Sequence, residues 1–92
     1  MQDGIESIGR GAFLCCDSLV LVELSEALTD LGDFAFADCG SLASVSFAGA
    51  NITALPDRAF YGCGSLARVN LPEGITSIGK RVFSGCEKLE TL

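Results

Sequence analysis

The chain has 92 residues, 49% hydrophobic and 20% charged, so it is long enough for one globular domain and too apolar to be disordered. Its net charge is −6 and no cluster of Lys and Arg with interleaved aromatic residues is present, which argues against nucleic acid as a partner. It contains no apolar run of about 18 residues, so we expect no direct insertion into a membrane.

One pattern recurs four times along the chain, at spacings of 23, 24 and 23 residues. Each copy holds a Phe, a Cys three residues later and a Leu three residues after that. The copies are Phe13, Phe36, Phe60 and Phe83, then Cys16, Cys39, Cys63 and Cys86, then Leu19, Leu42, Leu66 and Leu89. Self-similarity at such a period is the signature of a solenoid of stacked repeats.

The pattern divides the chain into repeats at residues 5–27, 28–51, 52–74 and 75–92, within a single domain over residues 1–92. A lone repeat buries too little apolar surface to offset the entropy lost in ordering its backbone, so stability depends on stacking. Because the last copy stops at Leu92, inside its expected strand, we expect the chain to be a fragment of a longer array whose neighbouring repeats are its partners.

In chain order, each repeat opens with two apolar residues three apart, such as Ile75 and Ile78, in a segment that is a candidate for a short strand. The next stretch, residues 9–16 in the first copy, spaces its apolar residues for one short helical or 3₁₀ turn. The repeat closes on Val-x-Leu or Val-x-Phe, a spacing that predicts a strand with Val22 and Leu24 facing inward. One turn-forming residue precedes the helical segment, at Gly9, Gly32, Pro56 and Gly79.

The single longer spacing comes from an extra residue within 48–51, which we expect to bulge outward without disturbing the core. Asn51-Ile52-Thr53 matches the acceptor pattern for N-glycosylation, so Asn51 is a candidate site if the protein is secreted by a eukaryotic cell. The competing interpretation is a chance match, since Ile52 is itself a core position.

The repeat resembles the leucine-rich repeat of the BspA type. Residues 75–89 read Ile-Thr-Ser-Ile-Gly-x-x-Val-Phe-Ser-Gly-Cys-x-x-Leu, and residues 35–42 and 59–66 match the same pattern, so the resemblance covers the chain from Ile5 to Leu92. It implies a right-handed α/β solenoid of bacterial or protist surface proteins that serve in adhesion and recognition. It therefore favours a location at the cell surface or outside the cell, and no catalytic residue belongs to its pattern.

The five cysteines are a possible site of metal binding or disulfide formation. No His is present and the cysteines do not form paired Cys-x₂₋₄-Cys motifs, so no metal site is predicted. One Cys per repeat instead predicts a ladder of small buried side chains about 4.8 Å apart, whereas a disulfide requires Cβ atoms about 3.8 Å apart. Cys15 lies beside this ladder and is expected to point outward, where a thiol can react.

The charges of the chain are unevenly distributed. Up to Asp57 there are nine acidic residues against Arg10 alone, whereas five basic residues follow from Arg58 onward against three acidic ones. Such a dipole can steer a partner or a neighbouring copy, or it is no more than a solvated surface. The acidic residues are scattered and no His can act as a base, so no catalytic residues and no cofactor are predicted.

Alternate residues of the closing strands should point outward and form a partner-binding face. They are Leu21, Glu23, Ser44, Ser46, Arg68, Asn70 and Thr91. We predict a non-catalytic recognition module for a protein or glycan, with Phe34 and Tyr61 as further contact residues. The alternatives are a spacer or stalk, because only Arg68 on this face is of a type common at binding hot spots, and an intracellular scaffold, which unpaired cysteines tolerate.

Overall fold

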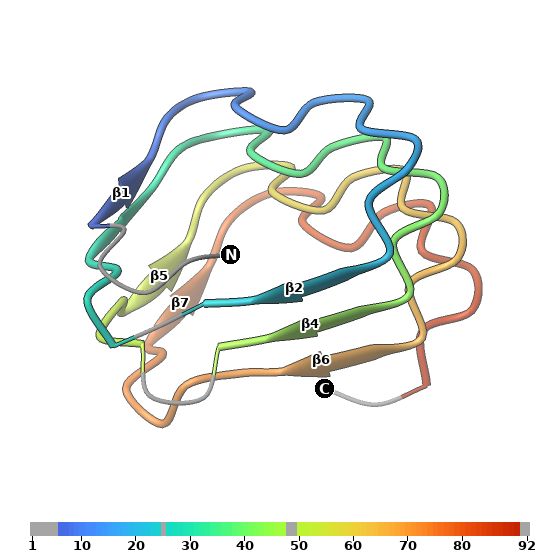
Figure 1. The fold of residues 1–92 in the computed structure, drawn as a ribbon. Coiled ribbons are helices and arrows are strands. Elements are labelled where there is room, and N and C mark those ends of the chain that lie inside the picture. The colour runs from blue at the N-terminus through green and yellow to red at the C-terminus, as the bar shows by residue number, and fades with distance from the viewer. Residues whose placement is uncertain (1–5, 25, 48–49, 91–92) are drawn as a thin grey trace.

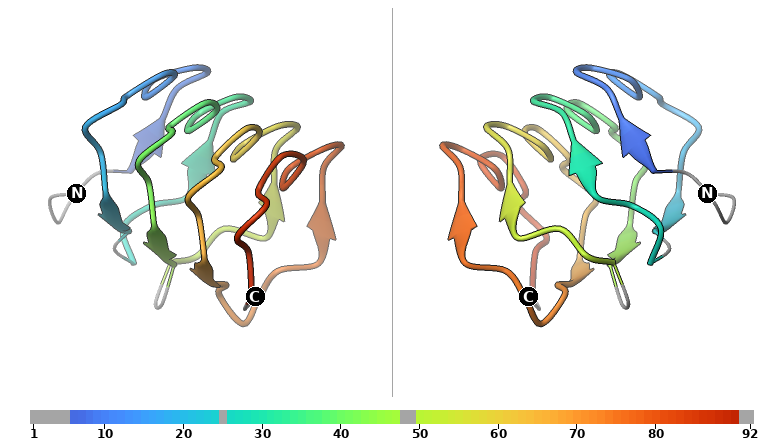
Figure 2. Two further views of the ribbon diagram at one scale, coloured as in Figure 1. Left: turned by 90° about the vertical axis from the view of Figure 1, so that its right-hand side faces the viewer. Right: turned by 90° about the vertical axis from the view of Figure 1, so that its left-hand side faces the viewer.

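The computed structural model describes residues 6–24, 26–47 and 50–90. Within them it contains strands joined by turns, and none of these residues is helical. The chain winds through successive coils, which follow one another in order from the N-terminus to the C-terminus (Figures 1 and 2). The strands are β1 (Ser7–Ile8), β2 (Leu21–Glu23), β3 (Asp30–Leu31), β4 (Ser44–Ser46), β5 (Ala54–Leu55), β6 (Arg68–Asn70) and β7 (Ser77–Ile78).

The strands pair in parallel between coils. β2, β4 and β6 form one three-stranded sheet, while β1 pairs with β3 and β5 pairs with β7 on another wall of the stack (Figure 1). The register places Val22 beside Val45 and Val45 beside Val69, so equivalent positions of successive repeats lie next to each other. Both predicted strands of the repeat, the closing one and the opening one, are confirmed.

Three coils show both strands, and the fourth shows only β7. The predicted closing position of the fourth repeat, Leu92, lies outside the described residues, as does the predicted face residue Thr91. The count of four repeats therefore stays a prediction.

The helical or 3₁₀ turn predicted over residues 9–16 is wrong. Two successive four-residue turns occupy this stretch, closed by hydrogen bonds from the Ala12 N–H to the Gly9 carbonyl (3.1 Å) and from the Cys16 N–H to the Phe13 carbonyl (3.2 Å). The third residue of each turn has a positive φ, a feature of type II turns that ends any helical run. The α/β class is therefore not supported for the described residues.

Residues with a positive φ, which is the left-handed region of backbone conformation, recur in every coil. They form two rows, one of Gly11, Phe34, Arg58 and Arg81 and the other of Cys15, Asp38, Gly62 and Gly85. Five of these eight residues are not Gly, although Gly adopts positive φ at the lowest cost. Stacking explains why they hold this shape, because the N–H groups along the segment donate to the next coil: Phe13 to Ala35 (2.8 Å), Phe36 to Ala59 (2.8 Å) and Phe60 to Val82 (3.1 Å).

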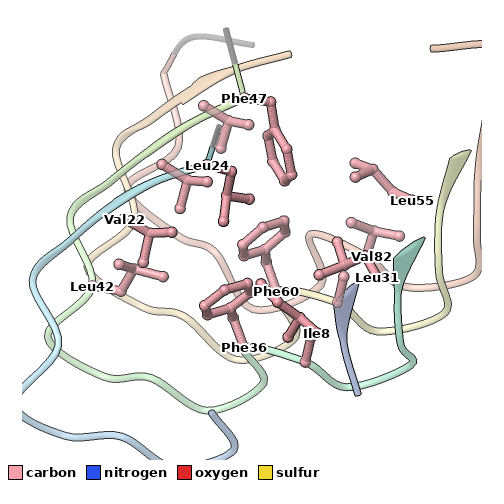
Figure 3. Close-up of a cluster of buried hydrophobic side chains, with 14 of the residues drawn as sticks. Ile8, Val22, Leu24, Leu31, Phe36, Leu42, Phe47, Leu55, Phe60 and Val82 are labelled. Atoms are coloured by element: carbon pink, nitrogen blue, oxygen red, sulfur yellow. The ribbon is translucent and has the colours of Figure 1, made fainter. Parts of the chain in front are cut away.

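The core lies between these turns and the strands (Figure 3). Phe13, Phe36, Phe60 and Phe83 stack face to face with ring centroids 5.1, 5.4 and 5.9 Å apart, which confirms the predicted ladder. Phe47 adds an edge-on contact to Phe60 at 5.9 Å. Phe36 and Phe60 are fully buried, whereas the end members of the stack are only partly buried.

The wall that carries β1, β3, β5 and β7 is interrupted between β3 and β5. The Gly32 N–H donates to the Ile8 carbonyl (2.7 Å) and the Gly79 N–H donates to the Leu55 carbonyl (2.8 Å), but Pro56, at the equivalent position, has no N–H to donate. An open groove of about 210 Å³ lies at the break, lined by residues 29–31, 52–54 and Pro56. The one Pro in place of Gly thus costs the wall a bond that its neighbours make.

The outward bulge predicted for residues 48–51 of the second repeat can be followed only at residues 50 and 51. Ala50 is buried and belongs to the core, so it does not bulge outward as predicted, whereas Asn51 is exposed. Residues 48 and 49 lie outside the described residues.

Candidate partner-binding face

Six of the seven predicted contact residues lie together on the outer face of the β2-β4-β6 sheet. Leu21, Ser44 and Arg68 are register partners across the three strands, and Glu23, Ser46 and Asn70 form a second such row. We call these six residues the outer face. They share the sheet with buried Val22, Val45 and Val69, whose side chains point the other way because successive residues of a strand alternate.

The side chains of the outer face are more exposed on its two edge strands than on its central strand. Leu21, Glu23, Arg68 and Asn70 are exposed, whereas the central Ser44 and Ser46 are half-buried. Leu21 has 53% of its surface exposed and the adjoining Val20 has 55%, so the β2 side presents apolar area to solvent. The face therefore combines an apolar edge with polar groups in one rigid frame.

The charges of the outer face lie at opposite corners. Glu23 is on β2 and Arg68 is on β6, two strands away, which corresponds to roughly 10 Å across the sheet. Both side chains are exposed. A partner that touches both corners meets one anionic and one cationic group in a fixed order.

An open groove of about 570 Å³ adjoins this face. Residues 50–53 and 70–74 line it, so Asn70 belongs to both the groove and the outer face. Buried Ala50, Ile52 and Pro72 contribute apolar surface to the groove, whereas exposed Glu73 supplies its one charged side chain. This volume lies in the range of ordinary ligand pockets.

Asn51, the candidate glycosylation residue, is exposed on the rim of this groove. Its Nδ2 donates to the Glu26 carbonyl at 2.9 Å and its backbone N–H donates to the Leu28 carbonyl at 3.3 Å. The following Ile52 is buried. The residue that would carry a glycan is thus held against the preceding coil on both its backbone and its side chain.

The additional contact candidates lie on the turn segments and not on the outer face. Phe34 is half-buried, and the guanidinium carbons of Arg10 and Arg58 lie 5.6 and 5.5 Å from its ring centroid. Cations at this distance are attracted to the face of an aromatic ring. Phe34 therefore serves as a bridge between coils, and half-buried Tyr61 lies in the same segment of the third coil.

All five cysteines are free thiols. Cys15 is exposed as predicted, and Cys39 and Cys63 are buried, whereas Cys16 and Cys86 are half-buried. Burial raises the pKa of the Cys63 thiol to about 12 and also raises the pKa of Cys39 and Cys86, so these thiols stay protonated at neutral pH. Across residues 6–24, 26–47 and 50–90, no three Cys, Asp or Glu side chains converge in a way that could hold a metal ion.

The cysteine ladder has a role that the sequence did not reveal. Each thiol donates to the carbonyl of the Phe in the preceding coil: Cys39 to Phe13 (3.1 Å), Cys63 to Phe36 (3.0 Å) and Cys86 to Phe60 (3.2 Å). The recurrence of Cys three residues after Phe is the signal that accompanies these bonds. A small hydrophobic residue would fill the same space but leave the carbonyl without this donor.

These features define a repeat protein in which parallel strands and type II turns stack coil on coil and present one exposed sheet face. A family model for the BspA type leucine-rich repeat region (6 copies) matches residues 1–92. The chain belongs to the BspA-type leucine-rich repeat family. No curated protein matches the chain.

Solved structures of bacterial leucine-rich repeat proteins share the fold. A leucine-rich repeat protein of T. pallidum is 37% identical with a TM-score of 0.90, over 98% of this chain and 42% of that one. A leucine-rich repeat protein of Bacteroides ovatus is 32% identical with a TM-score of 0.84, over 91% of this chain and 22% of that one. A leucine-rich cell surface protein of Faecalibacterium prausnitzii is 25% identical with a TM-score of 0.73, over 99% and 30%. The chain thus spans less than half the length of these relatives.

Proposed function

We propose that this chain is a non-catalytic recognition module that binds a protein or glycan partner on the outer face. The observation that carries the proposal is the register of β2, β4 and β6, which gathers six side chains from three repeats onto one exposed surface. Their inward neighbours are buried in the common core, so the outer residues can change without loss of the scaffold.

Binding on such a surface relies on many modest contacts around a few anchors. Arg68 is of the residue type most often found at hot spots, and Leu21 offers exposed apolar area to a partner. The central serines leave room for a partner group to approach the sheet closely.

The proposal includes display at the cell surface and a part in adhesion. It is supported by the similarity to the leucine-rich cell surface protein of F. prausnitzii. No helix within the described residues is long and apolar enough to span a membrane.

A spacer role is the second candidate, because small side chains at Ser44 and Ser46 occupy the centre of the outer face. On this account the coils contact only each other. The two functions differ in whether replacements on the outer face alter binding.

The test uses the folded chain and its variants Arg68→Ala and Asn70→Ala in binding assays on immobilised extracellular-matrix proteins and on a displayed random peptide library. Lys88→Ala is the matched control, since Lys88 is exposed on a turn and is not one of the six residues of the outer face. We expect both face variants to weaken binding and the control to leave it unchanged. Binding that is unchanged in both face variants, or no binding in any assay, favours the spacer.

A further inference from the structure

We propose that the groove beside Asn70 receives a basic side chain, arginine or lysine, of a protein segment that lies across the outer face. This inference rests on the proposed function and adds to it the chemistry of one contact. The groove is continuous with the outer face because Asn70 lines both. A segment that crosses β6 therefore reaches the groove without leaving the sheet.

The charge of the groove selects a cation. Glu73 is the one charged residue among the residues that line it, and its carboxylate is exposed. A carboxylate accepts hydrogen bonds and attracts an ammonium or guanidinium group, which offers several donors and no acceptor. An acidic side chain would be repelled at the same place.

The remaining polar groups can also accept hydrogen bonds from a donor-rich ligand. The Nδ2 of Asn51 is engaged with the Glu26 carbonyl, so its Oδ1 is the atom that can accept from a ligand. Thr53 and Asn70 line the same groove, and their side chains contain further acceptor oxygens. Several acceptors around one opening suit the guanidinium of arginine or the ammonium of lysine.

The apolar surface of the groove matches the stem of the same side chains. Ala50, Ile52 and Pro72 are buried beneath it, and Leu71 is half-buried beside them. Arginine and lysine pack their methylene groups on apolar surface while the charged end reaches polar groups. The groove thus provides apolar surface for the stem and acceptors for the charged end.

A protein segment is favoured over a glycan as the occupant. Neither the outer face nor the groove contains an aromatic side chain on which a sugar ring could stack. Both do contain charged and apolar groups that pair with peptide side chains, namely Glu23, Arg68 and Leu21 on the face and Glu73 in the groove.

The groove has a fixed wall on each side of the bound stem. The Asn51 N–H donates to the Leu28 carbonyl, and the Ala50 N–H donates to the Phe47 carbonyl at 2.8 Å, which together tie one wall to the core. The Ile75 N–H donates to the Pro72 carbonyl at 3.4 Å and closes the turn of the other wall. A preformed site of this kind loses less entropy on binding than one that must be ordered.

The experiment selects peptides from a displayed random library on the chain and removes those that also bind Ser44→Trp, a variant that blocks the centre of the outer face. Each arginine of a selected peptide is then replaced by citrulline, and each lysine by norleucine. Dissociation constants are measured by calorimetry on the unmodified chain, on Glu73→Gln and on Glu87→Gln. Glu87 is an exposed carboxylate on a turn outside the groove, and circular dichroism checks that all variants are folded.

We expect that one basic residue of the peptide contacts the groove. Its replacement should weaken binding about tenfold, because one charge-assisted hydrogen bond is lost. The same replacement should have no further effect in Glu73→Gln, and Glu87→Gln should bind as the unmodified chain does. Peptides that depend on Ser44 but bind equally well without their basic residues would overturn this inference and leave the proposed face intact. A library that gives no peptide dependent on Ser44 would overturn the inference and would also count against the face. A face that binds only glycans would overturn the inference as well.

Discussion

The Sγ atom of Cys63 donates a hydrogen bond of 3.0 Å to the carbonyl oxygen of Phe36, in the preceding coil. Both residues are fully buried. The same bond links Cys39 to Phe13 and Cys86 to Phe60, so the cysteine ladder connects the coils through the core in addition to filling it.

Replacement of Cys63 should separate the contribution of the hydrogen bond to stability from that of core packing. Cys63→Ala removes the donor and leaves the Phe36 carbonyl buried without it, which should lower the free energy of unfolding by about 1–3 kcal/mol. Cys63→Ser keeps a donor and should lose less. Chemical denaturation measures both variants, with exposed Cys15→Ala as the control, expected within about 0.5 kcal/mol of the unmodified chain. Equal losses for Ala and Ser would show that the bond contributes nothing.

Stability should fall at alkaline pH. The Cys63 thiol has an ordinary pKa of 9.0, which burial raises to about 12 in the folded chain. Between these values the unfolded thiol is ionised while the folded one keeps its proton, so the stabilisation present below pH 9 is progressively lost as the pH rises toward 12. Denaturation curves across this window should show a decline that is shallower in Cys63→Ser and unaltered in Cys15→Ser. An identical pH profile for Cys63→Ser would contradict the burial of this thiol.

Gly32 should resist replacement because the neighbouring coil leaves no room for a side chain. A Cβ atom at Gly32 would lie 2.6 Å from the carbonyl carbon of Gly9 and 2.8 Å from the Cα of Arg10. We expect Gly32→Ala to cost about 1–3 kcal/mol of unfolding free energy, as in other overpacked sites. Gly9 holds the same position of the first coil with nothing within 4 Å, so Gly9→Ala is the matched control and should be neutral or slightly stabilising. Similar melting temperatures for the two variants would count against the close stacking of these coils.

The left-handed rows predict a substitution that stabilises the chain. Arg81 is exposed with a φ of 56°, a conformation that costs a residue with a Cβ roughly 1–2 kcal/mol. Arg81→Gly relieves that cost but increases the entropy of the unfolded chain, for a net gain of about 0.5–1 kcal/mol. Lys80→Gly, one residue earlier and outside the left-handed region, should destabilise instead. A loss of stability in Arg81→Gly as large as that in Lys80→Gly would show that the turn tolerates its shape without strain.

The sequence predicts the parts of the fold that depend on repetition. Four Phe residues at a constant offset from Cys indicate that like side chains stack, and the structure confirms this for Phe13, Phe36, Phe60 and Phe83. The Val-x-Leu spacing likewise predicts which residues of β2 face outward. Both patterns are local consequences of which side chains must be buried.

The turn geometry could not be predicted from the same patterns. Apolar spacings of one, three and four residues fit a helical turn, but a pair of type II turns packs Phe13 and Cys16 against the core, where both are half-buried, and leaves Ala12 exposed. A left-handed residue is signalled by Gly at Gly11, Gly62 and Gly85, yet the equivalent positions hold Phe34, Arg58 and Asp38, which conceal the signal. The bonds between neighbouring coils hold these residues in that shape, and such long-range bonds leave no trace in local spacing.

The outer face of the candidate site could be predicted from the sequence, but the adjoining groove could not. The outer face follows from strand alternation, whereas the groove depends on how residues 50–53, where the second repeat passes into the third, approach residues 70–74 at the end of the third repeat. The extra residue at 48–51 marks the first of these segments in the sequence, but nothing marks the second.

The most direct test of the account is to map a bound partner on the chain by amide chemical shifts in nuclear magnetic resonance. A peptide selected on the chain should shift the amides of β2, β4 and β6 and of the groove residues Leu71, Glu73 and Gly74, while those of the turn segments 33–38 and 57–62 stay in place. Shifts confined to the turn segments, with the sheet amides unchanged, would contradict recognition through the outer face.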